Sequence, residues 1–142
     1  VEPSAARCAF AVADACALPA GDAFAPRSFD AVLAANLLCR LPDPDAFLRR
    51  LGGRDGLVKP GGVVYLVSPY SWMPQYTPRE AWLGGRAGDA EGGAAARVAA
   101  RMRELGFALE AERAEPLVIR DHARKFQFIV SHGMLFRRNE DA

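Results

Sequence analysis

Four aromatic side chains fall within thirteen positions of one another in the middle of the chain: Tyr70, Trp72, Tyr76 and Trp82. Aromatic rings exclude water, stack on planar heteroaromatic ligands and attract cations. Small ligands bind in clefts lined by such side chains, so this group predicts the walls of a binding pocket. The alternative is that the four rings pack together as a lid without contacting a ligand.

A dense charged cluster near the end of the chain contains Asp121, His122, Arg124 and Lys125. Arginine and lysine bind carboxylates, and histidine takes up or relays a proton near neutral pH. The alternative is a solvated loop between two strands, which is what charge runs usually are. The other histidine, His132, falls within a predicted strand, where we interpret it as structural.

Apolar runs bounded by turn-forming residues predict the strands that position these side chains. Their patterns predict strands over 8–12, 29–35, 63–67, 107–114 and 126–136. The run at 29–35 is continuous, which is typical of a strand buried on both faces. Residues 57–62 read as a turn leading into the strand at 63–67.

Two amphipathic helices lie between the predicted strands. Asp43 is typical of an N-cap and Pro44 of a first helical position, so one helix starts there. Apolar and basic residues at helical spacing predict a second helix over 94–105, ended by Gly106. This alternation predicts one α/β domain with a mostly parallel sheet. The last two strands have no helix between them, which predicts antiparallel neighbours.

Polar or unusual residues follow three of the predicted strands, at Asp14, 36–40 and 68–72. In open α/β sheets, ligands bind beyond the carboxyl ends of the strands. The sequence therefore predicts a ligand site on one rim of the sheet. Cys39 in this region is interpreted as a small buried hydrophobic residue, because nothing around it would lower a thiol pKa.

The composition excludes several classes of function. The chain has 142 residues with 18 basic and 17 acidic side chains, so its net charge is +1. This charge gives no electrostatic indication of binding to nucleic acid or to an anionic membrane. No apolar run approaches the roughly 20 residues of a membrane span, and the first residues do not form a signal peptide. Three cysteines without C-x-x-C spacing argue against a disulfide framework or a metal site. The expected setting is reduced and cytoplasmic.

Several motifs resemble those of a known enzyme family. The segments Phe29-Asp-Ala-Val-Leu-Ala-Ala-Asn36, Leu41-Pro-Asp-Pro44 and Val58-Lys-Pro-Gly-Gly62 resemble the second half of a class I S-adenosylmethionine (SAM)-dependent methyltransferase. A narrower resemblance covers essentially the whole chain. Its motifs are Asn36-Leu-Leu-Cys-Arg-Leu-Pro-Asp-Pro44, Ser68-Pro-Tyr-Ser-Trp72, Tyr76-Thr-Pro-Arg79, Trp82-Leu-Gly-Gly85 and Ile119-Arg-Asp-His-Ala-Arg-Lys-Phe-Gln127. Together they resemble the 4-mercaptohistidine N1-methyltransferases of ovothiol synthesis.

The resemblance implies a Rossmann-like fold and methyl transfer from SAM to an imidazole nitrogen of thiohistidine (4-mercaptohistidine). It implies that Asp14, with Ala15 beside it, lies by the adenine of the cofactor, the alternative being a turn residue. It places Asn36, Leu37 and Leu38 at the methionine end of the cofactor. The alternative for Asn36 is a hydrogen bond to a loop.

The resemblance also implies residues that face the acceptor. These are Pro69, Tyr70, Trp72, Tyr76, Thr77 and Trp82, with Arg124 or Lys125 on the amino-acid carboxylate and with His122 and Tyr70 in catalytic roles. A neutral imidazole nitrogen already carries a lone pair, so the transfer needs alignment more than a strong base. In this family the domain is often fused to a 5-histidylcysteine sulfoxide synthase, which is the expected partner.

One departure from the class I pattern concerns the cofactor loop. Class I enzymes carry a glycine-rich loop after the first strand and an acidic residue after the second, and this sequence contains no strand–G-x-G–helix unit. We therefore interpret residues 1–142 as the C-terminal part of one methyltransferase domain, a poor catalyst alone. The missing strands would lie between 8–12 and 29–35, so those two segments must pair directly or expose open edges.

Other functions fit parts of the same pattern. One alternative is a class I methyltransferase for another small acceptor, which an acceptor screen would distinguish. Another is a non-catalytic α/β module of a larger protein, favoured by the absent glycine loop and opposed by binding of S-adenosylhomocysteine. A nicotinamide oxidoreductase is a weaker alternative, because the dinucleotide fingerprint is also absent.

Overall fold

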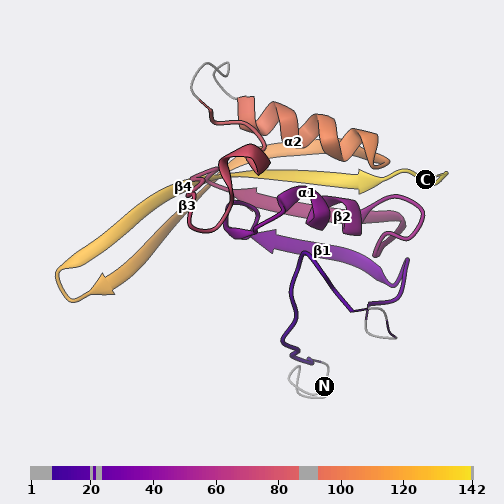
Figure 1. Cartoon of the computed structure of the whole chain (residues 1–142), viewed down its shortest axis with the longest axis horizontal. Coiled ribbons are helices and arrows are strands. Elements are labelled where there is room, and N and C mark those ends of the chain that lie inside the picture. The colour runs from indigo at the N-terminus through magenta and orange to yellow at the C-terminus, as the bar shows by residue number, and fades with distance from the viewer. Residues whose placement is uncertain (1–7, 20, 22–23, 87–92, 142) are drawn as a thin grey trace.

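The computed structural model describes residues 8–19, 21, 24–86 and 93–141. In this part of the chain the backbone forms a four-stranded sheet in the order β1-β2-β4-β3, together with two α-helices (Figure 1). The elements in chain order are β1 (Phe29–Ala35), the 3-10 helix η3 (Leu38–Arg40), α1 (Pro44–Leu51), β2 (Val58–Ser68), the 3-10 helix η4 (Arg79–Ala81), α2 (Gly93–Glu104), β3 (Phe107–His122) and β4 (Lys125–Arg138).

The strand directions confirm the predicted α/β sheet with an antiparallel last strand. β1 and β2 are parallel and are joined by a crossover through α1. β4 is antiparallel to both of its neighbours, β2 and β3. It follows that β1, β2 and β3 run in one direction and only β4 is reversed, so the carboxyl ends of the first two strands meet at one rim.

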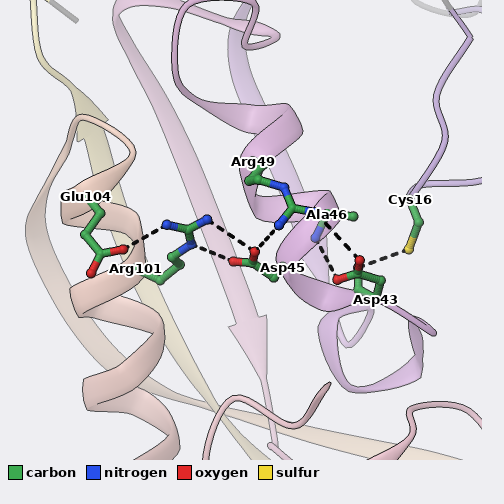
Figure 2. Close-up of polar contacts among 7 residues, drawn as sticks. All are labelled: Cys16, Asp43, Asp45, Ala46, Arg49, Arg101 and Glu104. Atoms are coloured by element: carbon green, nitrogen blue, oxygen red, sulfur yellow. Dashed lines mark hydrogen bonds and ion pairs between the residues drawn. The ribbon is translucent and has the colours of Figure 1, made fainter. Parts of the chain in front are cut away.

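Both α-helices pack on the same face of the sheet. Val98 and Met102 of α2 share one buried cluster with Leu48 of α1 and with alternate residues of β2 and β4. The two helices are also bridged by charge, because the Arg101 guanidinium of α2 contacts the Asp45 carboxylate of α1 (Figure 2). This helix-covered face holds the hydrophobic core.

The helix ends follow the sequence signals. The Asp43 side chain accepts a hydrogen bond from the Ala46 backbone N at 2.9 Å, which confirms it as the N-cap of α1. The second helix covers 93–104, one residue earlier than predicted at each end. Gly106 follows it with φ of +87°, a left-handed conformation that favours glycine.

β2 begins five residues before the predicted strand. Its first part contains the Pro-Gly-Gly segment that reads as a turn, and its pairing with β1 shifts register between Phe29 and Ala31. Gly61 there has φ of +72°. The turn-forming residues thus make an irregularity inside a strand rather than a separate loop.

The outer edge of β1 differs from its prediction. Burial of 29–35 on both faces is wrong, since only Ala34 is buried and Leu33 is 69% exposed. The predicted strand at 8–12 is also wrong, because these residues are exposed and have no regular structure. The two corrections have one cause. β1 is an edge strand of the described sheet, and no described strand lies beside it to pair with 8–12.

β3 and β4 continue well past the end of β2 and form a projecting hairpin (Figure 1). Ser68, the last residue of β2, pairs with His132, so beyond that point β4 pairs with β3 alone. We call residues 116–130 the β3–β4 arm. The two α-helices of the described ranges have eight and twelve residues, and neither is long and apolar enough to span a membrane.

Candidate functional site

The carboxyl ends of β1 and β2 form a rim that is tied to β4. The Asn36 backbone N donates to the Val67 carbonyl at 2.7 Å, directly after the last β1–β2 pair. The Ser131 hydroxyl of β4, itself fully buried, donates to the Asn36 side-chain oxygen at 2.8 Å. Asn36 is thereby held across the end of the sheet by a residue of a strand, whereas the partners predicted for its side chain were a loop and the cofactor.

Left-handed backbone occurs one residue after the end of β1 and two residues after the end of β2. Asn36 has φ of +54° and Tyr70 has φ of +51°. Asparagine tolerates this region, whereas a bulky aromatic residue adopts it at a cost of about 1–3 kcal/mol. Such strain concentrates at functional sites, where the surrounding structure enforces it. The conformation of Tyr70 therefore marks this rim independently of any motif.

Tyr70 contacts a histidine that we had interpreted as structural. Its hydroxyl lies 3.2 Å from His132 Nδ1, and the two rings are 6.0 Å apart at 58°. His132 Nε2 lies 3.2 Å from a Glu112 carboxylate oxygen. Burial, with a smaller contribution from the Glu112 charge, raises the pKa of Tyr70. The phenol therefore stays neutral and protonated across the physiological range.

The remaining aromatic residues mostly pack as a lid. Trp72 is buried and stacks on Trp82 with ring centroids 6.5 Å apart at 18°. Trp82 Nε1 donates to the Thr77 carbonyl at 2.8 Å, and the fully buried Thr77 hydroxyl donates to the Leu41 carbonyl at 2.7 Å. These contacts give Trp72, Thr77 and Trp82 a packing role, and their contact with an acceptor stays a prediction.

Two further residues of the loop after β2, Tyr76 and Pro69, keep accessible surface. Tyr76 is 47% exposed, and the Arg40 guanidinium lies 5.4 Å from its ring centroid. Arg40 also donates to the Ser71 carbonyl at 2.7 Å, which joins the loop after β1 to the loop after β2. Pro69 is partly buried between Ser68 and Tyr70.

The predicted cofactor residues lie in two different environments. Asp14 is exposed and its side chain accepts from the Cys16 backbone N at 2.9 Å, the turn bond that was its alternative role. The Cys16 thiol donates to the Asp43 carbonyl at 3.2 Å, which attaches residues 14–16 to the start of α1 (Figure 2). Burial raises the pKa of that thiol.

The segment after β1 is partly withdrawn from the rim. Leu38 is 2% exposed and belongs to the hydrophobic core, so its side chain does not reach a ligand at the rim. Cys39 is likewise buried, as predicted for a small hydrophobic residue. Leu37 and Ala15 are partly buried against this core. Among the predicted cofactor residues, Ala15, Asn36 and Leu37 are therefore partly exposed, whereas Asp14 is exposed and Leu38 is buried.

The structure does not bring His122, Arg124 and Lys125 to Tyr70. They lie at the turn of the β3–β4 arm, where Lys125 forms an ion pair with Asp121 at 2.9 Å. Lys125 is seven positions along β4 from His132, roughly 23 Å at about 3.3 Å per strand residue. The cause is that β3 and β4 keep pairing beyond the rim and carry their turn into solvent. We therefore leave these three residues out of the proposed site.

Sequence reasoning placed Arg40 at the rim within residues 36–40 but missed three other residues as site residues: His132, Glu112 and Ser131. These three reach the rim only through the register of β4 against β2 and β3, which pairs His132 with both Ser68 and Ala114. A single sequence does not contain that register. Polar residues within an otherwise apolar strand, Ser131 and His132, were the one available signal.

A hollow with a volume of about 880 Å³ lies elsewhere in the described chain. It runs along α1 and is lined by residues such as Phe24, Arg50 and Leu105. Its lining includes neither Tyr70 nor His132. We place the candidate site at the rim because strain, buried polar bonds and the Tyr70–His132 contact coincide there.

Comparison with known proteins finds similarity to methyltransferases. Residues 2–66 match the family model of a methyltransferase domain. A SAM-dependent methyltransferase from Methanosarcina mazei has a similar structure, with a TM-score of 0.58, 19% identity and alignment over 92% of this chain and 66% of that one. A structure from work on conversion of a disulfide bond into a thioacetal group during echinomycin biosynthesis aligns with a TM-score of 0.56 and 16% identity, over 94% of this chain and 56% of that one. No curated protein matches the chain.

These findings establish the fold and its family resemblance. The chain spans about two thirds and somewhat more than half of the lengths of the two solved proteins. The family match falls on the segment that contains β1, the rim residues after it and most of β2. The matches support S-adenosylmethionine as the cofactor, and the chain has the Rossmann-like fold of class I SAM-dependent methyltransferases.

Proposed function

We propose that the protein carrying this chain is a SAM-dependent N-methyltransferase that methylates an imidazole nitrogen of thiohistidine. The observation that carries the proposal is the position of Tyr70, strained at the end of β2 and bonded to His132, beside the segment that follows β1. In class I enzymes cofactor and acceptor meet at this rim. The motifs shared with the ovothiol methyltransferases support the choice of acceptor.

The residues present fit one side of the cofactor. The exposed Asp14 carboxylate has capacity beyond its turn bond to accept from an adenine amino group, and the partly open Asn36 and Leu37 border the methionine end. The described residues do not include a glycine-rich loop opening a helix after a strand, so other parts of the protein would hold the remaining side. When bound, the cofactor supplies an electrophilic methyl group.

The acceptor side of the rim suits a planar heteroaromatic ring. Tyr70 and Tyr76 offer partly exposed aromatic surface on which such a ring can stack. The Trp72–Trp82 stack and the Thr77 hydrogen bond hold the same loop in place. A loop held in this way would help to orient the acceptor nitrogen, and alignment supplies much of the rate acceleration in such a displacement.

A methyltransferase for another small nitrogen acceptor is the second candidate. The Tyr70–His132 pair could take the proton from any acceptor that must lose a ring proton, and its geometry does not select for an acceptor that carries a thiol. We further propose that a sulfoxide synthase domain supplies thiohistidine and that the protein acts in the cytoplasm. These last points are supported by the motif resemblance alone.

The test uses the full-length protein that contains this sequence. It is incubated with SAM and with thiohistidine or plain histidine, and the products are identified by mass spectrometry. Binding of S-adenosylhomocysteine is measured in parallel by calorimetry. Methylation of thiohistidine alone supports the proposal and shows that the thiol is required.

Each other outcome overturns a defined part of the proposal. Cofactor binding with no methylation of either compound removes the ovothiol assignment and leaves a methyltransferase for another acceptor. Methylation of both compounds at equal rates removes the specificity for the thiol. Absence of cofactor binding by the folded protein removes the enzymatic function and favours a non-catalytic module.

A further inference from the structure

Three side chains from three separate elements form a connected chain at the rim. Tyr70 comes from the loop after β2, His132 from β4 and Glu112 from β3. The Tyr70 hydroxyl is 3.2 Å from His132 Nδ1, and His132 Nε2 is 3.2 Å from Glu112 Oε1. Such a sequence of hydroxyl, imidazole and carboxylate is the arrangement by which proteins activate a hydroxyl group.

We propose that Tyr70, His132 and Glu112 form a proton relay that accepts the ring proton of a heteroaromatic N–H acceptor during methyl transfer. The inference rests on the proposed function and assigns two residues, His132 and Glu112, that no motif identified. Tyr70 contacts the acceptor, and the other two are positioning residues that act through it.

The contacts of His132 define the direction of the relay. The Glu112 carboxylate carries a negative charge 3.2 Å from Nε2, which favours a proton on that nitrogen. His132 Nδ1 then presents a lone pair to the Tyr70 hydroxyl, which donates to it. Glu112 and Tyr70 are the titratable groups in contact with His132, from β3 and from the loop after β2, in the described structure.

The pleat of the sheet explains why these residues meet. His132 and Met134 lie two positions apart on β4 and so point to the same face. Glu112 pairs with Met134 across the β3–β4 ladder and therefore shares that face. His132 is partly buried and Glu112 is half-exposed, which leaves the carboxylate a route for passing a proton to solvent.

The proton balance of the step is complete with these groups. The neutral acceptor ring forms a bond from its lone-pair nitrogen to the methyl group as the sulfur–methyl bond breaks, and the sulfur keeps that electron pair. The methylated ring is then a cation with one N–H. That proton passes to the Tyr70 oxygen while the Tyr70 proton passes to His132 Nδ1. The products are a neutral methylated ring, a neutral phenol and an imidazolium beside the Glu112 carboxylate.

The arrangement avoids a tyrosinate. Burial raises the pKa of Tyr70, so its hydroxyl acts by passing a proton on rather than by losing one. The imidazolium forms next to a carboxylate, which stabilises it. The positive charge of the relay thus forms on His132, and the Glu112 carboxylate contacts His132 rather than Tyr70.

The first experiment tests the geometry without catalysis. Nitrogen NMR of the imidazole rings is recorded on the full-length protein, and the His132 signals are identified as those that disappear in His132→Gln. The expected spectrum shows His132 protonated on Nε2, with its Nδ1 signal shifted in Tyr70→Phe and its Nε2 signal shifted in Glu112→Gln. The relay is contradicted if His132 is protonated on Nδ1, or if neither substitution shifts its nitrogen signals.

The second experiment measures methyl transfer by the full-length protein as a function of pH. We expect His132→Gln to lower kcat about 100-fold or more, as for loss of an acid–base group, and Glu112→Gln to lower it about tenfold. Glu112→Gln should also move the acidic limb of the profile to lower pH, because an amide stabilises an imidazolium less than a carboxylate does. Titration of the acceptor itself would not move with that substitution.

The two histidines give a matched comparison. The loss should follow His132→Gln and not His122→Gln, since His122 lies at the far end of the β3–β4 arm. A wild-type protein that transfers no methyl group contradicts the proposed function, whereas the NMR result still decides the relay geometry. A wild-type protein that is active, with unchanged kcat and pH profile in His132→Gln, contradicts the relay alone.

Discussion

The rim and the β3–β4 arm share a strand yet are built on opposite principles. At the rim, polar side chains are buried and bonded: Ser131 to Asn36, Thr77 to Leu41 and Tyr70 to His132. Along the arm, apolar side chains such as Phe126 and Phe128 are largely exposed, and the charges gather at the turn. Folding alone favours neither arrangement, because buried polar groups cost free energy and exposed apolar groups gain none.

The difference shows what each region contributes. The rim has buried side-chain hydrogen bonds and two left-handed residues, which is the kind of detailed positioning that a site for aligning two reactants requires. The arm is held by one ladder of backbone hydrogen bonds, and an isolated two-stranded hairpin is marginally stable in water. The proposed site therefore lies where β4 is paired on both sides, and the arm lies where it is paired with β3 alone.

The largest test of this contrast compares two phenylalanines on one face of β4. Phe136 is fully buried in the core, whereas Phe128 on the arm is 69% exposed. Phe136→Ala should lower the free energy of unfolding by about 3–5 kcal/mol, because it leaves a cavity. Phe128→Ala should change it by less than about 0.5 kcal/mol. Urea denaturation of both variants measures the difference, and an equal cost would mean that the arm is packed in solution.

A smaller effect is expected from a buried polar group of the rim. Thr77→Val keeps the volume of the side chain but removes the hydroxyl that donates to the Leu41 carbonyl. A buried carbonyl left without its partner costs about 1–3 kcal/mol. Thr77→Ser retains the hydroxyl and should recover most of that loss in the same denaturation experiment. Equal losses in the two variants would show that the methyl group, not the bond, matters.

Sequence patterns located the elements better than the site. The N-cap at Asp43, the helix over 93–104 and the strand β1 follow from local signals, because caps and periodicity act within a few residues. The length of β3 and β4 was missed. Whether two strands continue beyond their neighbour depends on their pairing with each other, which no local pattern encodes.

The absence of pairing information in local sequence patterns also explains why the sequence did not predict which of the two histidines contacts Tyr70. Charge density favoured His122 as the functional one, and the apolar strand pattern favoured a structural His132. The structure instead places His132 against Tyr70, because the β2–β4 register sets Ser68 opposite it. Burial of both faces of β1 failed for a related reason, since burial depends on which strands and helices lie next to it. Tyr70 itself was located by its position after a predicted strand.

Alkaline stability separates the rim from the rest of the loop. The pKa of Tyr70 is raised chiefly by burial, so the folded chain keeps this phenol protonated at pH values where the unfolded chain ionises it. Its contribution is fully present below the ordinary tyrosine pKa of about 10 and is lost as pH rises toward the folded value. Tyr70→Phe should therefore flatten the fall in urea midpoint above pH 10. Tyr76→Phe, in the same loop, is the matched control, and an identical effect in both would remove the special role of Tyr70.

The smallest effect is expected at the turn of the arm. Hydrogen bonds from Lys125 and, secondarily, Gln127 lower the pKa of Asp121, so its contribution to stability is present above the ordinary carboxyl range and is lost as pH falls through the folded value. Because the pair is exposed, salt screens it and its contribution is slight. Lys125→Met should raise the pKa of Asp121, measured by carboxyl NMR, while leaving the urea midpoint at neutral pH unchanged. A clear loss of stability in Lys125→Met would mean that the arm has a fixed place in the fold, and the contrast with the rim would no longer hold.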